Sequence, residues 1–104
     1  MRMIMHIDFP PEPFNTLVRN GTAGTTLQKA LNDVKPEAAY FSEENGQRGG
    51  ILIVDLPEAS KMPALAEPFF LTLNASVRFR VAMTPEDLAR ADLESIGKKY
   101  PQPR

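Results

Sequence analysis

The stretch Gly49–Leu56 constrains the fold more than any other part of the chain. Four consecutive apolar residues, Ile51 to Val54, follow a glycine pair and stop at Asp55 and Pro57. A short apolar run between turn residues predicts a strand that is buried on both faces, because a strand with one wet face would alternate apolar and polar residues. Each face of this strand therefore needs a cover.

Length and charge limit the kinds of protein that this chain can be. Its 104 residues suit one domain, which we place at residues 1–97, followed by a charged, proline-broken tail at 98–104 that we expect to be mobile. Lys and Arg number 12 and Asp and Glu 13, so the formal net charge is -1. A chain without a basic excess has no field that gathers phosphates, and nucleic acid is not an expected partner.

Cysteine content and hydropathy exclude further classes. The chain has no cysteine, which rules out disulfides and thiolate metal sites. No apolar run approaches the roughly 20 residues of a membrane helix, and the N-terminal residues turn polar too soon for a signal sequence. We therefore expect a cytoplasmic protein without a membrane partner.

Residue periodicity predicts four strands and three helical regions. Alternation of apolar and polar residues marks strands at Met3–Phe9, 38–43 and Val77–Met83. The apolar run within Gly49–Leu56, here called the central run, is the fourth strand. Phe14 to Val34 has helical spacing but contains Gly21 and Gly24, so it is one helix with a weak middle or two helices at an angle. Further helices are expected after a Ser60 cap and from Pro85 to Ile96.

This order of elements predicts an α+β fold. Strand, helix, strand, strand, helix, strand is the ferredoxin-like βαββαβ order, with an antiparallel sheet, the first and third strands in the middle, and both helices on one face. A C-terminal helix follows. The other face is expected to pack against a second copy in a two-fold homodimer that encloses a barrel, or else the C-terminal helix covers it in a monomer.

Several stretches resemble known proteins. Ile51–Glu58, the helix ending in Pro68-Phe69-Phe70 and the strand at Val77 are similar to parts of muconolactone isomerase and its relatives in the dimeric α+β barrel superfamily, as is Ile4-Met5-His6 before a proline-marked turn. The whole chain resembles small uncharacterised bacterial proteins that share the stretches 35–41, 74–77 and 83–88. The resemblance implies the fold and the dimer. It transfers no catalytic residue.

Strand parity brings polar groups together on the face assigned to the barrel. His6 and Asp8 share that face of the first strand, and Arg78 and Arg80 share it on the fourth, which should lie beside the first. A histidine there suits a general base near neutral pH, and an arginine suits a carboxylate or enolate oxygen. Tyr40 or Phe41, whichever points inward, would add an aromatic wall. Alternatively, these groups only satisfy the dimer interface.

Two functions fit these residues. One is a cofactor-independent enzyme of isomerase or monooxygenase type that acts on a small carboxylate or aromatic compound, with His6, Arg78 and Arg80 as catalytic residues. The other is a non-catalytic module that binds or senses a small ligand. A lone histidine with scattered acids lacks the spacing of a metal site, so no metal is expected. Glu67 and Asn74 are interpreted as a solvated helix residue and a helix cap.

Overall fold

The computed structural model of the protein describes residues 1–103 and contains one four-stranded antiparallel sheet. Its strands are β1 (Arg2–Phe9), β2 (Ala38–Glu44), β3 (Gln47–Asp55) and β4 (Ser76–Val81), in the order β2-β3-β1-β4. The central apolar run is β3, which lies between β1 and the edge strand β2. The ferredoxin-like order predicted from the sequence is therefore confirmed.

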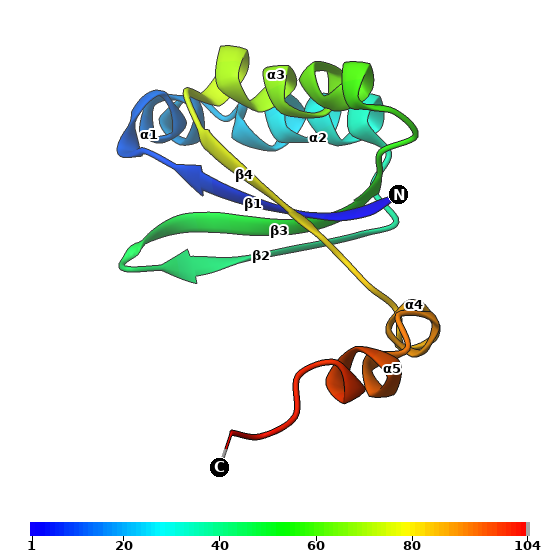
Figure 1. The fold of residues 1–104 in the computed structure, drawn as a ribbon. Helices are drawn as coiled ribbons and strands as arrows, with labels where there is room; N and C mark the ends of the chain where they lie inside the picture. The colour runs from blue at the N-terminus through cyan, green and yellow to red at the C-terminus, as the bar shows by residue number, and fades with distance from the viewer. Residues whose placement is uncertain (104) are drawn as a thin grey trace.

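Three helices cover one face of this sheet, as Figure 1 shows: α1 (Pro11–Arg19), α2 (Ala23–Val34) and α3 (Met62–Leu73). The first helical region is two helices, because Gly21 between them has a φ of +78°, a left-handed conformation that interrupts a helix. The predicted Ser60 cap is wrong. Ser60 lies in the 3₁₀ turn η1 (Ala59–Lys61) before α3, and its hydroxyl donates to the Glu58 carboxylate at 2.9 Å.

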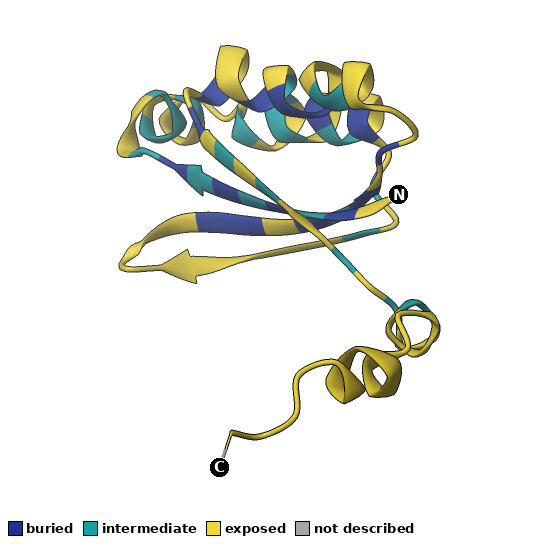
Figure 2. Ribbon diagram, viewed as in Figure 1, coloured by how far each residue is buried: buried dark blue, intermediate teal, exposed yellow. Residues whose placement is uncertain are grey.

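The hydrophobic core fills the space between the sheet and these helices. Alternate residues of β1 and β3 point toward the helices and are buried there, as the dark blue segments of Figure 2 indicate. The largest side chains of this core that are fully buried are Phe9, Phe69, Met5, Ile7, Leu52, Leu73 and Val54. The sheet face toward the helices is thus closed within one chain.

The opposite sheet face, which we call the open face, has no helix over it (Figure 1). Its residues are Ile4, His6 and Asp8 of β1 and their partners on neighbouring strands. Ile51 of the central strand is 42% exposed and Tyr40 beside it is 69% exposed. Residues 1–103 of a single chain therefore do not provide the second cover predicted for the central strand.

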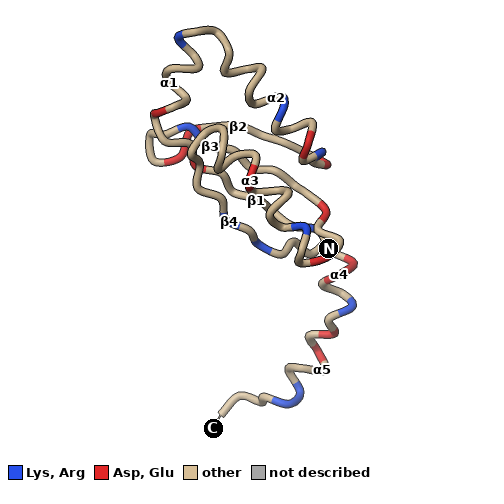
Figure 3. The backbone as a smooth tube through the Cα atoms, turned by 90° about the horizontal axis from the view of Figure 1, so that it is seen from above, with Lys and Arg blue, Asp and Glu red and all other residues tan. Residues whose placement is uncertain are grey.

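The C-terminal segment differs from the single helix predicted from Pro85 to Ile96. It forms α4 (Pro85–Arg90) and α5 (Leu93–Lys98), because Asp92 takes a left-handed φ of 52° that breaks the helix. These helices lie on the open-face side of the sheet but away from it (Figures 1 and 3), so they do not cover that face of their own chain. The predicted tail begins at the last residue of α5, and Arg104 lies outside the described residues.

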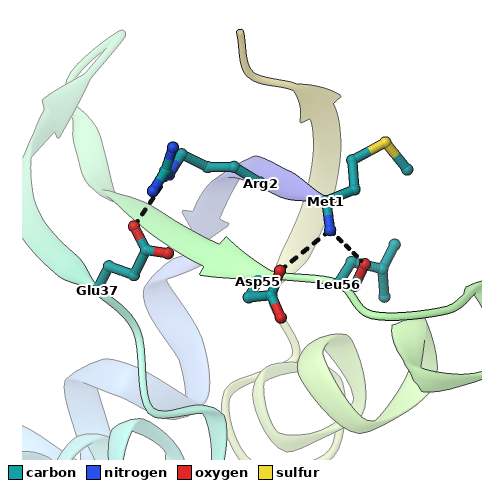
Figure 4. A network of polar contacts seen from close by, with 5 residues as sticks. All are labelled: Met1, Arg2, Glu37, Asp55 and Leu56. Carbon is teal, nitrogen blue, oxygen red and sulfur yellow. Dashed lines mark hydrogen bonds and ion pairs between the residues drawn. The ribbon is translucent and has the colours of Figure 1, made fainter. Parts of the chain in front are cut away.

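A polar network ties the first residues of β1 to their neighbours (Figure 4). The Met1 ammonium lies 3.0 Å from both the Asp55 carboxylate and the Leu56 carbonyl oxygen, and Arg2 Nε donates to the Glu37 carboxylate at 3.0 Å. These contacts fix one end of the open face. None of the helices in residues 1–103 is long and apolar enough to cross a membrane.

Candidate functional site

Three side chains on adjacent strands surround a hollow on the open face. His6 of β1 lies opposite Ile51 of β3, and Ile51 lies opposite Tyr40 of β2. The hollow has a volume of about 290 Å³. Its apolar floor, aromatic side and single imidazole make it suitable for a small, partly apolar ligand.

The glycine pair shapes this hollow on one face and the core on the other. Gly49 points to the open face between Asp8 and Ser42, so no side chain fills the space next to His6. Gly50 points the other way, and the Phe41 ring packs so closely that a Cβ there would lie 3.0 Å from it. Tyr40 is therefore the aromatic residue at the site, and Phe41, its alternative, lies on the helix-covered side.

Arg78 connects this hollow to a cluster of carboxylates. It lies opposite His6 on β4, and its Nη2 is 3.4 Å from Asp8 Oδ2 and 3.8 Å from Glu44 Oε1. These three side chains line a second hollow of about 360 Å³, which meets the first at Glu44. One guanidinium thus reaches from β4 at one edge of the sheet to β2 at the other, over the face that carries His6.

Arg80 lies farther from His6 than Arg78 does. It is opposite Ile4, two residues along β1 from His6, and it does not line either hollow. Within residues 1–103 it makes no ion pair. Of the residues proposed from the sequence, the structure brings together His6, Tyr40, Asp8 and Arg78.

Strand β2 contributes two residues to this site, Ser42 and Glu44, in addition to the Tyr40 expected from the sequence. Ser42 and Glu44 line the hollow with Tyr40, and the three alternate along β2, which is the signal that could have identified them. Glu43 is adjacent, but its carboxylate accepts a hydrogen bond from the Gly46 amide at 3.0 Å and stabilises the turn. Of these two glutamates, Glu44 is thus the one that pairs with Arg78, at 3.8 Å.

The chemistry available here is proton transfer beside a held oxygen. His6 is half-buried and has apolar neighbours, an environment in which an imidazole can take a proton from a bound molecule. Arg78 offers several N–H donors, and its two carboxylate partners leave it more than half exposed. The carboxylates of Glu12 and Asp87 accept local hydrogen bonds, and these lower the pKa of each group below its ordinary value.

A larger groove of about 780 Å³ lies between α2 and α3, on the outer surface of the helices. It is lined mainly by threonines and small apolar residues, with Lys29, Asp33 and Glu67. It contains no residue from the cluster on the open face and no histidine. Glu67 is exposed there as a solvated helix residue, and Asn74 ends α3 in a left-handed cap with a φ of 52°, as interpreted from the sequence.

Comparisons with known proteins support the architecture. No family model and no curated protein matches the sequence. Among solved structures, the chain is similar to 5-chloro-2-hydroxyhydroquinone dehydrochlorinase from Burkholderia phenoliruptrix AC1100, in complex with 2,5-dihydroxybenzoquinone. The TM-score is 0.56 at 13% identity, over 83% of this chain and 97% of that one. The likeness confirms the predicted α+β fold, with one antiparallel sheet and helices.

Proposed function

We propose that this protein is a cofactor-independent enzyme for a small carboxylate or aromatic compound, working as a homodimer whose open faces meet. His6 takes a proton from a carbon next to a carbonyl or phenol group, and Arg78 binds the oxygen on which negative charge develops. The observation that carries the proposal is the hollow lined by His6, Tyr40 and Ile51, beside Arg78.

The size of the site supports a small ligand. The hollow of about 290 Å³ is near the lower end of the range for small-molecule sites, roughly 300–1,000 Å³. It is open on one side in a single chain, and a second sheet over the open face would enclose it. The dehydrochlorinase of similar fold was solved with 2,5-dihydroxybenzoquinone, a compound of suitable size.

The homodimer is supported by the exposed apolar centre of the open face. Ile51 on the inner strand β3 and Tyr40 beside it on the edge strand β2 are both exposed, and a monomer would leave them in water. Packing two such faces around a two-fold axis buries the exposed apolar residues of both protomers at once.

Hydrogen exchange tests the proton transfer without knowledge of the product. The protein is incubated in D₂O with 2,5-dihydroxybenzoquinone and with a panel of aromatic acids and unsaturated lactones, and proton NMR follows exchange of the ligand's carbon-bound hydrogens. We expect catalysed exchange for at least one compound and a loss of at least about 100-fold in His6→Gln. Arg19→Gln on α1, outside the site, is the matched control and should match the wild type.

Calorimetry separates binding from catalysis. Arg78→Gln should weaken binding of the responsive compound about tenfold or more, because charge-assisted hydrogen bonds contribute about 1.5–3 kcal/mol. Gly49→Val should also weaken binding, because its side chain fills the hollow beside His6. If no compound binds, or if binding is unaffected by Arg78→Gln and Gly49→Val, the proposed site is wrong.

A non-catalytic ligand-binding module is the second candidate. The observation that favours it is the pairing of Arg78 with both Asp8 and Glu44, which neutralises much of the positive charge that would stabilise an enolate. In that case, the same variants weaken binding, and no hydrogen exchange occurs with any bound compound.

A further inference from the structure

The segment Met83–Tyr100, here called the C-terminal arm, projects from the body of the molecule. It follows β4 at Ala82, whose amide donates to the Arg2 carbonyl oxygen at 3.0 Å, and it then leaves the sheet edge (Figures 1 and 3). The molecule measures 64 × 30 × 20 Å and has a radius of gyration of 18.1 Å. A compact domain of this length has a radius of gyration of about 13 Å.

The arm has defined local structure although it lacks tertiary support. Thr84 and Asp87 form a reciprocal capping box at the start of α4, with hydrogen bonds of 3.0 and 3.1 Å, and Arg90 pairs with Asp87. Each helix of the arm has only six residues. Isolated helices shorter than about 12–15 residues are marginal in water, so α4 and α5 need a surface to pack on.

The arm also carries apolar side chains that its own chain does not bury. Leu88, Leu93, Ile96 and Tyr100 are 45%, 58%, 47% and 78% exposed. An isolated exposed leucine is ordinary, but four large apolar residues on one short projecting segment form an unpartnered surface. Figure 2 shows the arm as the most continuously exposed part of the chain.

We infer that the arm of each protomer packs on the open face of its partner and forms one wall of the partner's ligand site. This inference rests on the homodimer of the proposed function. The arm lies on the side of the sheet where the partner would sit, and each protomer has one open face and one arm to exchange (Figure 1). If each protomer places its arm on the open face of the other, both arms and both open faces are covered, and no unpaired surface is left for a third chain.

Each of the two surfaces carries charged side chains that the other could pair. Arg80 lies on the open face and makes no ion pair within residues 1–103, whereas Glu86 and Glu94 of the arm are likewise unpaired there. A glutamate of the partner's arm next to Arg80 would compensate this charge. The arginine predicted from the sequence as a site residue would then position the partner's arm and make no contact with the ligand.

Cross-linking tests the exchange directly, because the chain has no cysteine of its own. One sample carries Ile51→Cys and a second, labelled with ¹⁵N, carries Leu93→Cys. The two are mixed at low concentration, concentrated, and treated with a short bis-maleimide, and mass spectrometry counts links between labelled and unlabelled chains. We expect this pair to link at least tenfold faster than a control pair with Leu71→Cys in place of Ile51→Cys, because Leu71 lies on the helical side and is 81% exposed.

The outcomes separate the inference from the function on which it rests. A dimer by light scattering in which both pairs link equally slowly overturns arm exchange and leaves the facing sheets intact. A monomer at all concentrations overturns both the exchange and the proposed homodimer.

Point variants of the full chain give a second measurement. Leu93→Asp with Ile96→Asp should raise the dimer dissociation constant at least tenfold and weaken ligand binding, with an unchanged melting temperature of the protomer at dilution. Leu71→Asp should change neither. If the arm variant dimerises and binds ligand like the wild type, the arm does not form part of the site.

Discussion

The two faces of the sheet are built from alternate residues of the same strands, yet they have different surroundings. Leu52 and Val54 of β3 are buried under the helices, whereas Ile51, one residue away, lies on a face without a cover. The buried residues of the helix-covered face are all apolar. The open face combines an apolar centre with His6, Arg78 and carboxylates.

This difference indicates that the two faces serve different purposes. Charged groups are not expected on a face that only stabilises the fold, because burying a charge is costly unless it is paired. A face that binds a ligand or a partner needs both apolar area and a few directional polar groups. The open face has that mixed composition. Variants on the two faces therefore test whether one stabilises the fold and the other binds a ligand or a partner.

The largest effect is expected from the core, where two adjacent phenylalanines on α3 differ. Phe69 is 0% exposed and Phe70 is 41% exposed. Phe69→Ala should lower the free energy of unfolding by about 3–5 kcal/mol, because it leaves a cavity between helix and sheet. Phe70→Ala should cost less than half as much. Urea denaturation measures both, and equal losses would contradict the assignment of the helix-covered face as the core.

A charge introduced on the open face should weaken dimerisation and leave the unfolding free energy of the protomer nearly unchanged. Ile51→Glu places a carboxylate without a partner in the proposed interface, which should weaken dimerisation by at least about 3 kcal/mol. The unfolding free energy of the protomer should change by about 0.5 kcal/mol or less, as for exposed sites in general. Light scattering across a dilution series measures the dimer, and Val18→Glu on α1 is the control. A dimer that persists in Ile51→Glu would show that the open face is not the interface.

A smaller effect is expected at Gly50, where the two faces are linked through the backbone. A valine there would collide with the Phe41 ring, which lies 3.0 Å from the position of a Cβ. We expect Gly50→Val to destabilise the protein by about 1–3 kcal/mol, as overpacking does. Gly24→Ala has open space and should instead stabilise α2, by up to about 1 kcal/mol. Thermal unfolding of the two variants should therefore shift in opposite directions.

The smallest effect is expected when the pH is lowered, and it should be confined to the arm. The Thr84 backbone amide donates to the Asp87 carboxylate, which lowers the pKa of Asp87 below its ordinary value. A lowered pKa in the folded state means that this cap stabilises α4 at neutral pH and is lost as the pH falls through that pKa. NMR should show the Thr84 amide shifting below about pH 4 while core amides are unchanged. Asp87→Asn should abolish that transition, and a transition that persists in this variant would contradict the assignment.

Strand parity allowed much of the fold and part of the site to be predicted from the sequence. The alternation in β1 and β4 placed His6 and Arg78 on one face, and they are directly opposite each other in the register. The apolar residues at every position of the central run predicted that both its faces need a cover. The placement of His6 and Arg78 succeeds because a strand has a period of two, whatever the rest of the chain does. The need for a cover on the second face stays a prediction.

Other features depend on contacts that no local pattern contains. Arg78 reaches Glu44 across the whole sheet, and this ion pair depends on the curvature of the sheet and the conformation of two long side chains. The break between α4 and α5 occurs at Asp92, where the sequence has neither glycine nor proline. The placement of the arm away from its own sheet is likewise a tertiary property, and it excludes only one of the two covers that the sequence left open, the C-terminal helix of the same chain.

The contact of the Met1 ammonium with Asp55 and Leu56 has a practical consequence for the choice of affinity tag. A tag fused ahead of Met1 would replace the ammonium with a neutral peptide N–H, and an exposed ion pair of this kind contributes about 1 kcal/mol or less. The core would tolerate that loss. However, the adjacent Arg2 carbonyl accepts the hydrogen bond from Ala82, the last residue before the arm, so an N-terminal tag is best removed before assembly is measured.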